Sequence, residues 1–94
     1  MNQYESIIIV NPNLDEAGLK ALEEKFTGLI NENGKVESVE NMGKKKLAYE
    51  IKKCKEGTYL LFNFEAKPDS ITELERVYRI TDEIMKFIVV RKEA

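Results

Sequence analysis

Six lysines lie close together in the middle of the sequence, between residues 42 and 55. They are Lys44, Lys45, Lys46, Lys52, Lys53 and Lys55, and with Glu50 as the only acidic residue among them this segment carries a net charge of +5. The whole chain has a formal net charge of −2 at pH 7, which leaves −7 for the remaining residues. Clustered ammonium groups can neutralise the phosphates of a nucleic acid. Lysines on an edge strand also prevent unwanted strand pairing, and composition alone favours neither interpretation.

The usual arrangements of catalytic residues are missing from the sequence. The chain has no histidine, which excludes an imidazole base, a Ser-His-Asp triad and a histidine-ligated metal. Cys54 is the only cysteine, so the chain has neither an internal disulfide nor a CxxC metal motif. The five glycines form no phosphate-binding loop. We therefore predict a protein that is not an enzyme, with no cofactor, no metal and no small-molecule substrate.

The spacing of apolar residues predicts six elements that position the lysines. Either Asn13 or Asp15 can cap the first helix, and Ser70 with Glu73 forms a capping-box pattern at the start of the second. Gly43 is the expected place for a bend in the second strand. The predicted elements are strands over residues 4–10, 35–51, 58–66 and 84–90, a helix over 15–33 and a short helix that begins at 70.

The order of these elements, βαββαβ, is that of the ferredoxin-like α+β fold. Because crossover connections are right-handed, two helices should pack on one face of a four-stranded antiparallel sheet. The first and third strands should be central, and the second and fourth should be edges. A chain of 94 residues builds one core, so we predict a single domain over residues 1–94. No apolar run is long enough for a signal peptide or a membrane span, and we expect a cytoplasmic protein that binds no membrane.

Two surfaces of this fold are candidates for binding. In the basic segment Leu47, Tyr49 and Ile51 alternate and should face the core. Lys44, Lys46 and Lys52 should project from the opposite side. The second surface is the sheet face that no helix covers, where the first and last strands are apolar in both alternating positions. A contiguous apolar patch there would bind a protein partner. The residues that we predict for this partner surface are Ile8, Tyr59, Leu61 and Ile88.

The uncovered sheet face lacks the residues with which RNA-recognition-motif domains stack bases. Such domains carry aromatic residues at alternating positions of the third strand. This sequence has Thr58 and Leu60 at those positions. Any RNA bound by this chain should therefore be held through its backbone.

The segment from Gly43 to Lys52 resembles the signature of the bacterial small-subunit ribosomal protein six family. That signature is a glycine, basic residues, then Leu-Ala-Tyr-x-Ile and a basic residue. The likeness runs the whole chain and includes Tyr4-Glu5, Asn11-Pro12-Asn13-Leu14, Arg79-Ile80-x-Asp82 and Val89-Val90.

The resemblance implies a structural protein of the ribosome in the cytoplasm. Members of the family have the ferredoxin-like fold and pair with small-subunit ribosomal protein eighteen. The heterodimer binds the central domain of 16S ribosomal RNA during assembly of the platform. By position in the family pattern, the expected RNA contacts are Lys44, Lys45 and Lys46, with Tyr4, Lys86 and Arg91 as further candidates.

Two alternatives share the predicted fold. A regulatory interaction module would self-associate through the open sheet face, and a stable homodimer in dilute solution would support it. A small acylphosphatase-like hydrolase would need an anion-binding loop after the first strand. The segment that follows this strand carries Asp15 and no arginine, which argues against the hydrolase.

Overall fold

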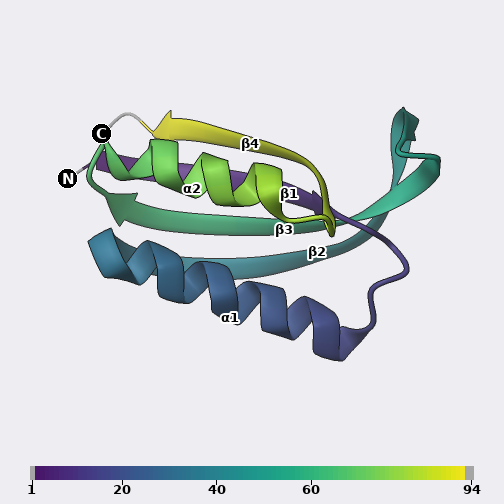
Figure 1. The fold of residues 1–94 in the computed structure, drawn as a ribbon, viewed down its shortest axis with the longest axis horizontal. Helices are drawn as coiled ribbons and strands as arrows, with labels where there is room; N and C mark the ends of the chain where they lie inside the picture. The colour runs from purple at the N-terminus through teal and green to yellow at the C-terminus, as the bar shows by residue number, and fades with distance from the viewer. Residues whose placement is uncertain (1, 93–94) are drawn as a thin grey trace.

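The computed structural model describes residues 2–92, which form one sheet with two helices on one of its faces (Figure 1). The strand order is β2-β3-β1-β4, and all neighbouring strands are antiparallel. This confirms the predicted ferredoxin-like arrangement with the first and third strands in the centre. The elements are β1 Asn2–Val10, α1 Glu16–Asn33, β2 Gly34–Ile51, β3 Cys54–Ala66, α2 Ser70–Ile80 and β4 Ile84–Lys92.

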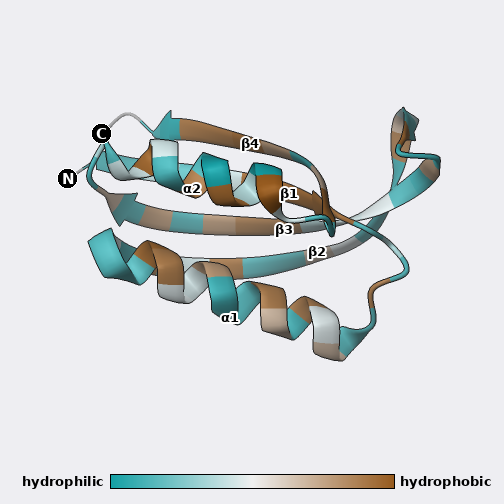
Figure 2. Ribbon diagram, in the orientation of Figure 1, coloured by the Kyte–Doolittle hydropathy of each residue, from teal (hydrophilic) through white to brown (hydrophobic). Residues whose placement is uncertain are grey.

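The core lies between the helices and the sheet face that they cover. Alternate residues of β1 and β3 point into it, and each helix alternates hydrophobic and hydrophilic residues along its length (Figure 2). Burying each large apolar side chain contributes about 1.5–3 kcal/mol, so this layer supplies most of the folding free energy. Its largest fully buried side chains include Ile8 and Val10 from β1, Leu60, Phe62 and Phe64 from β3, and Phe26 and Tyr78 from the helices.

The two helices begin in different ways. Asp15 caps α1, because its side-chain oxygen accepts a hydrogen bond of 2.8 Å from the backbone N–H of Gly18. The capping box predicted for α2 is wrong. The hydroxyl of Ser70 donates instead to the carbonyl of Lys67 at 2.7 Å, and Glu73 forms an ion pair with Arg76 at 2.6 Å.

A buried polar contact joins β1 to α2. The hydroxyls of Ser6 and Tyr78 are 2.9 Å apart, and both side chains are almost completely buried. Burial raises the pKa of Tyr78 to about 12, with the hydrogen bond to Ser6 acting in the opposite direction. The phenol is therefore a neutral structural group at physiological pH.

The hairpin of β2 and β3 is longer than the sheet that it belongs to. β1 ends at Val10, opposite Thr58, but the two hairpin strands continue to a turn at Lys52 and Lys53. We call residues 44–57 the hairpin arm; it curves away from the rest of the sheet in Figure 1. No third strand lies beside it, so its side chains have less protein around them than those of the core.

Candidate nucleic-acid interface

Local backbone geometry sets the direction of the hairpin arm. The β2–β3 register shifts between Asn41 and Gly43, and Gly43 has a φ of +80°, which confirms the bend predicted there. The Asn41 side chain accepts a hydrogen bond of 2.8 Å from the Gly43 N–H. At the tip, Lys52 and Lys53 have φ values of 48° and 65°, the left-handed conformation that two-residue hairpin turns need. Asparagine and glycine adopt it more easily, so the chain carries two lysines where they cost stability.

The arm is held against β4. The Lys86 ammonium donates a hydrogen bond of 3.2 Å to the Tyr49 hydroxyl and lies 5.7 Å from the centre of the Tyr49 ring. Nearer the tip, the Lys52 ammonium donates to the backbone carbonyl of Ile84 at 3.4 Å. These contacts join residues more than thirty positions apart in the sequence. They give the arm a defined orientation without burying it.

Gly57 allows the base of the arm to pack closely. A Cβ atom at this position would lie 2.4 Å from Cγ2 of Ile9 and 2.9 Å from Cε of Met85. Both distances are far below van der Waals contact, so a side chain here would push the arm away from β1 and β4. The glycine therefore fixes how the arm meets the sheet.

All three lysines of the predicted RNA contact are exposed, and they lie on two sides of the arm. Lys45 pairs with Gly57 on the uncovered face, and its ammonium is 5.6 Å from the centre of the Tyr59 ring. Lys44 pairs with Thr58, whose side chain faces the helices. None of the three forms an ion pair with the residues that the structure describes. Their charges are therefore available to an anionic partner approaching from either side.

The prediction that Tyr49 packs in the core is wrong. Leu47 is 9% exposed, as predicted, and Ile51 is half-buried, but Tyr49 is 64% exposed. The β2–β3 register shifts between Lys46 and Ile51, so strict alternation does not hold here, and this part of the strand extends beyond the core. The exposed Tyr49 ring, joined to Lys86, is a functional candidate that the sequence interpretation missed.

The further candidates from the sequence do not lie together. Lys86 is exposed and belongs to the arm surface through Tyr49. Arg91 is exposed on the opposite side of β4, about 17 Å further along the strand at about 3.4 Å per residue. Tyr4 is only 7% exposed and stacks on Phe64 with ring centres 5.7 Å apart. Its role is core packing, so we remove it from the predicted contacts.

The uncovered sheet face carries an apolar row across three strands. Ile7 pairs with Leu61 on one side and with Ile88 on the other, and directly paired residues share a face. Tyr59 lies beside this row, next to Ile9. The prediction that Ile8 belongs to this surface is wrong, because Ile8 is completely buried under the helices. Ile7 is the residue of β1 that takes its place.

Polar residues bound the apolar row on the side away from the arm. The Lys92 ammonium donates to the side-chain oxygen of Asn63, whose amide donates to the Ser38 hydroxyl at 3.0 Å. This chain of contacts crosses from β4 to β2. The uncovered face is thus basic near the arm, apolar in the middle and polar and hydrogen-bonded at the far end.

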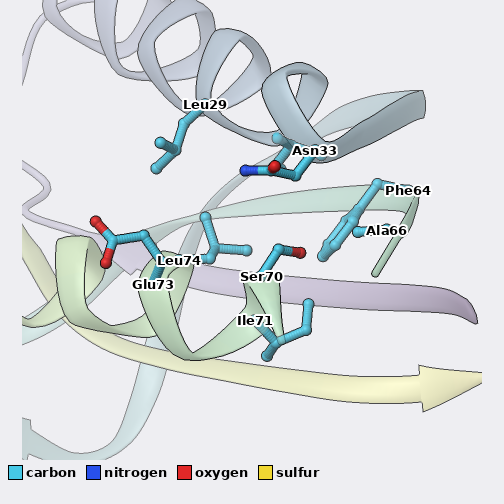
Figure 3. A pocket seen from close by; sticks show the side chains of 9 residues that line it. Leu29, Asn33, Phe64, Ala66, Ser70, Ile71, Glu73 and Leu74 are labelled. Carbon is cyan, nitrogen blue, oxygen red and sulfur yellow. The ribbon is translucent and has the colours of Figure 1, made fainter. Parts of the chain in front are cut away.

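Other sites for chemistry are not found in the described part of the chain. A gap of about 20 Å³ between the end of α1 and the start of α2, lined by Leu29, Asn33, Phe64 and Ser70 among others, has room for about one water molecule (Figure 3). Residues 2–92 hold no cluster of acidic or cysteine side chains that could bind a metal ion. No helix among them is long and apolar enough to cross a membrane.

The fold and the two surfaces define a ferredoxin-like domain that presents a cationic arm and an apolar sheet row for binding. A sequence profile of the family described as ribosomal protein S6 matches residues 3–91. The chain therefore belongs to the ribosomal protein S6 family, whose members are non-enzymatic structural components of the small ribosomal subunit in the bacterial cytoplasm. The interpretation of the sequence as a member of this family is confirmed.

Individual relatives agree with this assignment. The chain is 53% identical over 94 residues to the small ribosomal subunit protein bS6 of Clostridium novyi, covering 99% of both chains. It is 49% identical to that of Clostridium botulinum, with 99% of this chain and 100% of the relative covered. The crystal structure of 30S ribosomal protein S6 from Thermotoga maritima superposes with a TM-score of 0.91 at 40% identity, covering 97% of this chain and 87% of that one.

Proposed function

We propose that this protein binds the central domain of 16S ribosomal RNA as a heterodimer with small-subunit ribosomal protein eighteen and so assists assembly of the platform. The observation that carries the proposal is the separation of two surfaces: a cationic arm with unpaired lysines, and an apolar row at the centre of the uncovered sheet face. The arm suits phosphates and the row suits a protein. Family membership supports a ribosomal setting for both.

The proposed RNA contacts are Lys44, Lys45, Lys46 and Lys86. Each phosphate that they neutralise should release counter-ions and add about 0.7–0.9 to the salt slope of binding. Arg91 lies apart and would reach a different RNA segment. The remainder of the chain carries a net charge of −7, which repels RNA, so a basic partner is needed to supply additional attraction.

The proposed partner surface consists of Ile7, Leu61 and Ile88, with Tyr59 at its edge. Ile88 is 48% exposed, an unusual exposure for isoleucine in the middle of a strand. A charged residue here should weaken the heterodimer. Ile88→Glu tests this, and Ile80→Glu is the matched control, because Ile80 is 65% exposed at the end of α2, away from the row.

The test is to measure the affinity for a central-domain RNA fragment with and without the partner. We expect weak binding by the chain alone and much tighter binding by the heterodimer. Ile88→Glu should reduce the partner-dependent gain, and Ile80→Glu should leave it unchanged. Equal, tight binding without any partner would contradict the proposal. A stable homodimer in sedimentation experiments would favour self-association through the same face.

A further inference from the structure

A hollow of about 320 Å³ lies where α2, β4 and the tip of the hairpin arm meet. Two cationic side chains reach it from different elements: Arg79 from α2 and Lys52 from the arm. Lys86 of β4 also borders it, but Lys86 pairs with Ile9 on the uncovered face, whereas Phe87 pairs with the buried Ile8. None of the described residues that line it is acidic. The resemblance to the family singled out Arg79 in the sequence, but the RNA contacts proposed above give it no role.

Each cation is oriented by a contact that leaves its charge without a counter-ion. The Arg79 guanidinium lies 5.8 Å from the centre of the Phe87 ring. Lys52 donates to the carbonyl of Ile84, and Lys86 donates to the Tyr49 hydroxyl. Within residues 2–92 the only ion pair joins Arg76 to Glu73. The hollow therefore holds the charges of Arg79 and Lys52, with Lys86 at its border, and no carboxylate of the described chain neutralises them.

No carboxylate of residues 2–92 forms an ion pair with Arg79. Asp82 and Glu83 lie in the turn between α2 and β4, close to Arg79 along the chain. Both are exposed, neither lines the hollow and neither lies within ion-pair distance of Arg79. The guanidinium therefore keeps its charge at the hollow, with the Phe87 ring as its contact.

The surroundings of Arg79 and Lys52 suit a phosphate group. The floor of the hollow includes Tyr78, Ile84 and Phe87, whose apolar surface reduces solvent screening of a bound anion. A guanidinium presents two parallel N–H donors that match the oxygens of a phosphate, and the flexible Lys52 ammonium group can complete the contact. The hollow is also continuous with the arm through the contact of Lys86 with Tyr49.

We propose that this hollow binds a phosphate of the RNA backbone, as a second anchor distinct from Lys44, Lys45 and Lys46. The inference rests on the proposed function, since it assigns the phosphate to RNA. Lys52 belongs to the tip of the arm, so an RNA strand that follows the arm toward β4 reaches the hollow. The left-handed turn at Lys52 and Lys53 costs stability, and it places the Lys52 side chain at the hollow.

The test compares two charge-matched double variants in the RNA-binding complex with the partner. Arg79→Gln with Lys52→Gln removes two charges from the hollow. Lys20→Gln with Lys67→Gln removes two exposed charges from α1 and from the far end of the sheet. The first variant should lower the salt slope of RNA binding by about one to two units, and the second should leave it unchanged. Unchanged melting temperatures for both would show that each variant is folded.

A second measurement identifies the anion. The side-chain N–H resonances of Arg79 should shift when either inorganic phosphate or a short RNA is added to the full chain, and Lys52→Gln alone should reduce this response. A shift with inorganic phosphate but not with RNA would overturn the assignment to RNA. If the hollow variant and the wild type had equal salt slopes, the hollow would not bind an RNA phosphate, and the proposed function would be unaffected. Failure of the wild-type complex to bind RNA would instead overturn the proposed function.

Discussion

The helix-covered face of the sheet and the hairpin arm are built on opposite principles. On the covered face, Ile8, Leu60 and Phe62 have no exposed surface, and even the Ser6 hydroxyl is hydrogen-bonded inside. On the arm, Leu47 is the only buried side chain of an apolar residue, and the lysines have no ion-pair partners in the described chain. The covered face therefore stabilises the fold, whereas the arm presents charge and contributes little stability. We call this the division between the covered face and the arm.

The largest expected effect is a truncation in the core. Phe26 is fully buried and lies edge-on to Tyr78, with ring centres 4.8 Å apart. Phe26→Ala should reduce the free energy of unfolding by about 3–5 kcal/mol, measured by urea denaturation. Tyr49→Ala on the arm removes an aromatic ring that is 64% exposed and should cost less than about 1 kcal/mol. Similar losses for both variants would contradict the division.

Alkaline pH should weaken the covered face through Tyr78. Its pKa is raised to about 12 in the folded protein, against about 10 in the unfolded chain, so the folded state holds the proton more tightly. Tyr78 makes its full contribution to the free energy of unfolding below pH 10. This contribution, about 2–3 kcal/mol in all, is lost as the pH rises through 12. Denaturation between pH 9 and 12 should show the loss, and Tyr78→Phe should remove this part of the pH dependence.

Replacing two different glycines with alanine should change the free energy of unfolding in opposite directions. Gly57→Ala places a Cβ atom against Ile9 and Met85 at the base of the arm, and should cost about 1–3 kcal/mol. Gly28→Ala on α1 meets no atom within 4 Å and should stabilise the protein by about 0.4–1 kcal/mol. Thermal unfolding of the two variants is the measurement. A neutral Gly57→Ala would mean that the arm is not seated on the sheet as described.

A further small effect is expected at Thr58, where the arm joins the covered face. Its hydroxyl is buried and has no hydrogen-bond partner among the described residues. Thr58→Val keeps the shape and should stabilise the protein by about 1 kcal/mol. Thr81→Val is the control, because the Thr81 hydroxyl donates a hydrogen bond of 2.6 Å to the carbonyl of Val77 and its loss should destabilise. Calorimetric melting that moved both variants in one direction would contradict this assignment.

Much of the fold could be predicted from the sequence because its signals are local. Helical spacing predicted the first helix over residues 15–33, and it spans Glu16–Asn33. Gly43 marked the bend, and the element order gave the sheet topology. The facing of the β1 side chains could not be predicted in this way. Residues 7–10 are apolar in both alternating positions, so the pattern could not show which of them face the helices. Pairing with β3 decides it, and it places Ile7 outward and Ile8 inward.

The candidate site was predictable in composition but not in geometry. The lysines and the family signature are visible in the sequence, and so are Arg79 and Lys86. The contacts of Lys52 with Ile84 and of Lys86 with Tyr49 are not visible, because they depend on an arm that bends across the end of the sheet to touch β4. Alternation likewise assigned Tyr49 to the inner face of its strand, although no core lies beneath that part of the arm.

The most direct test of the division is the salt dependence of RNA binding by the heterodimer, with the three lysines of the arm replaced together. Lys44→Gln with Lys45→Gln and Lys46→Gln should lower the slope by about two to three units while the melting temperature stays close to that of the wild type. The charge-matched control, glutamine at Lys20, Lys35 and Lys67, should keep the wild-type slope. An unchanged slope in the arm variant, or a loss of stability like that of Phe26→Ala, would contradict the account.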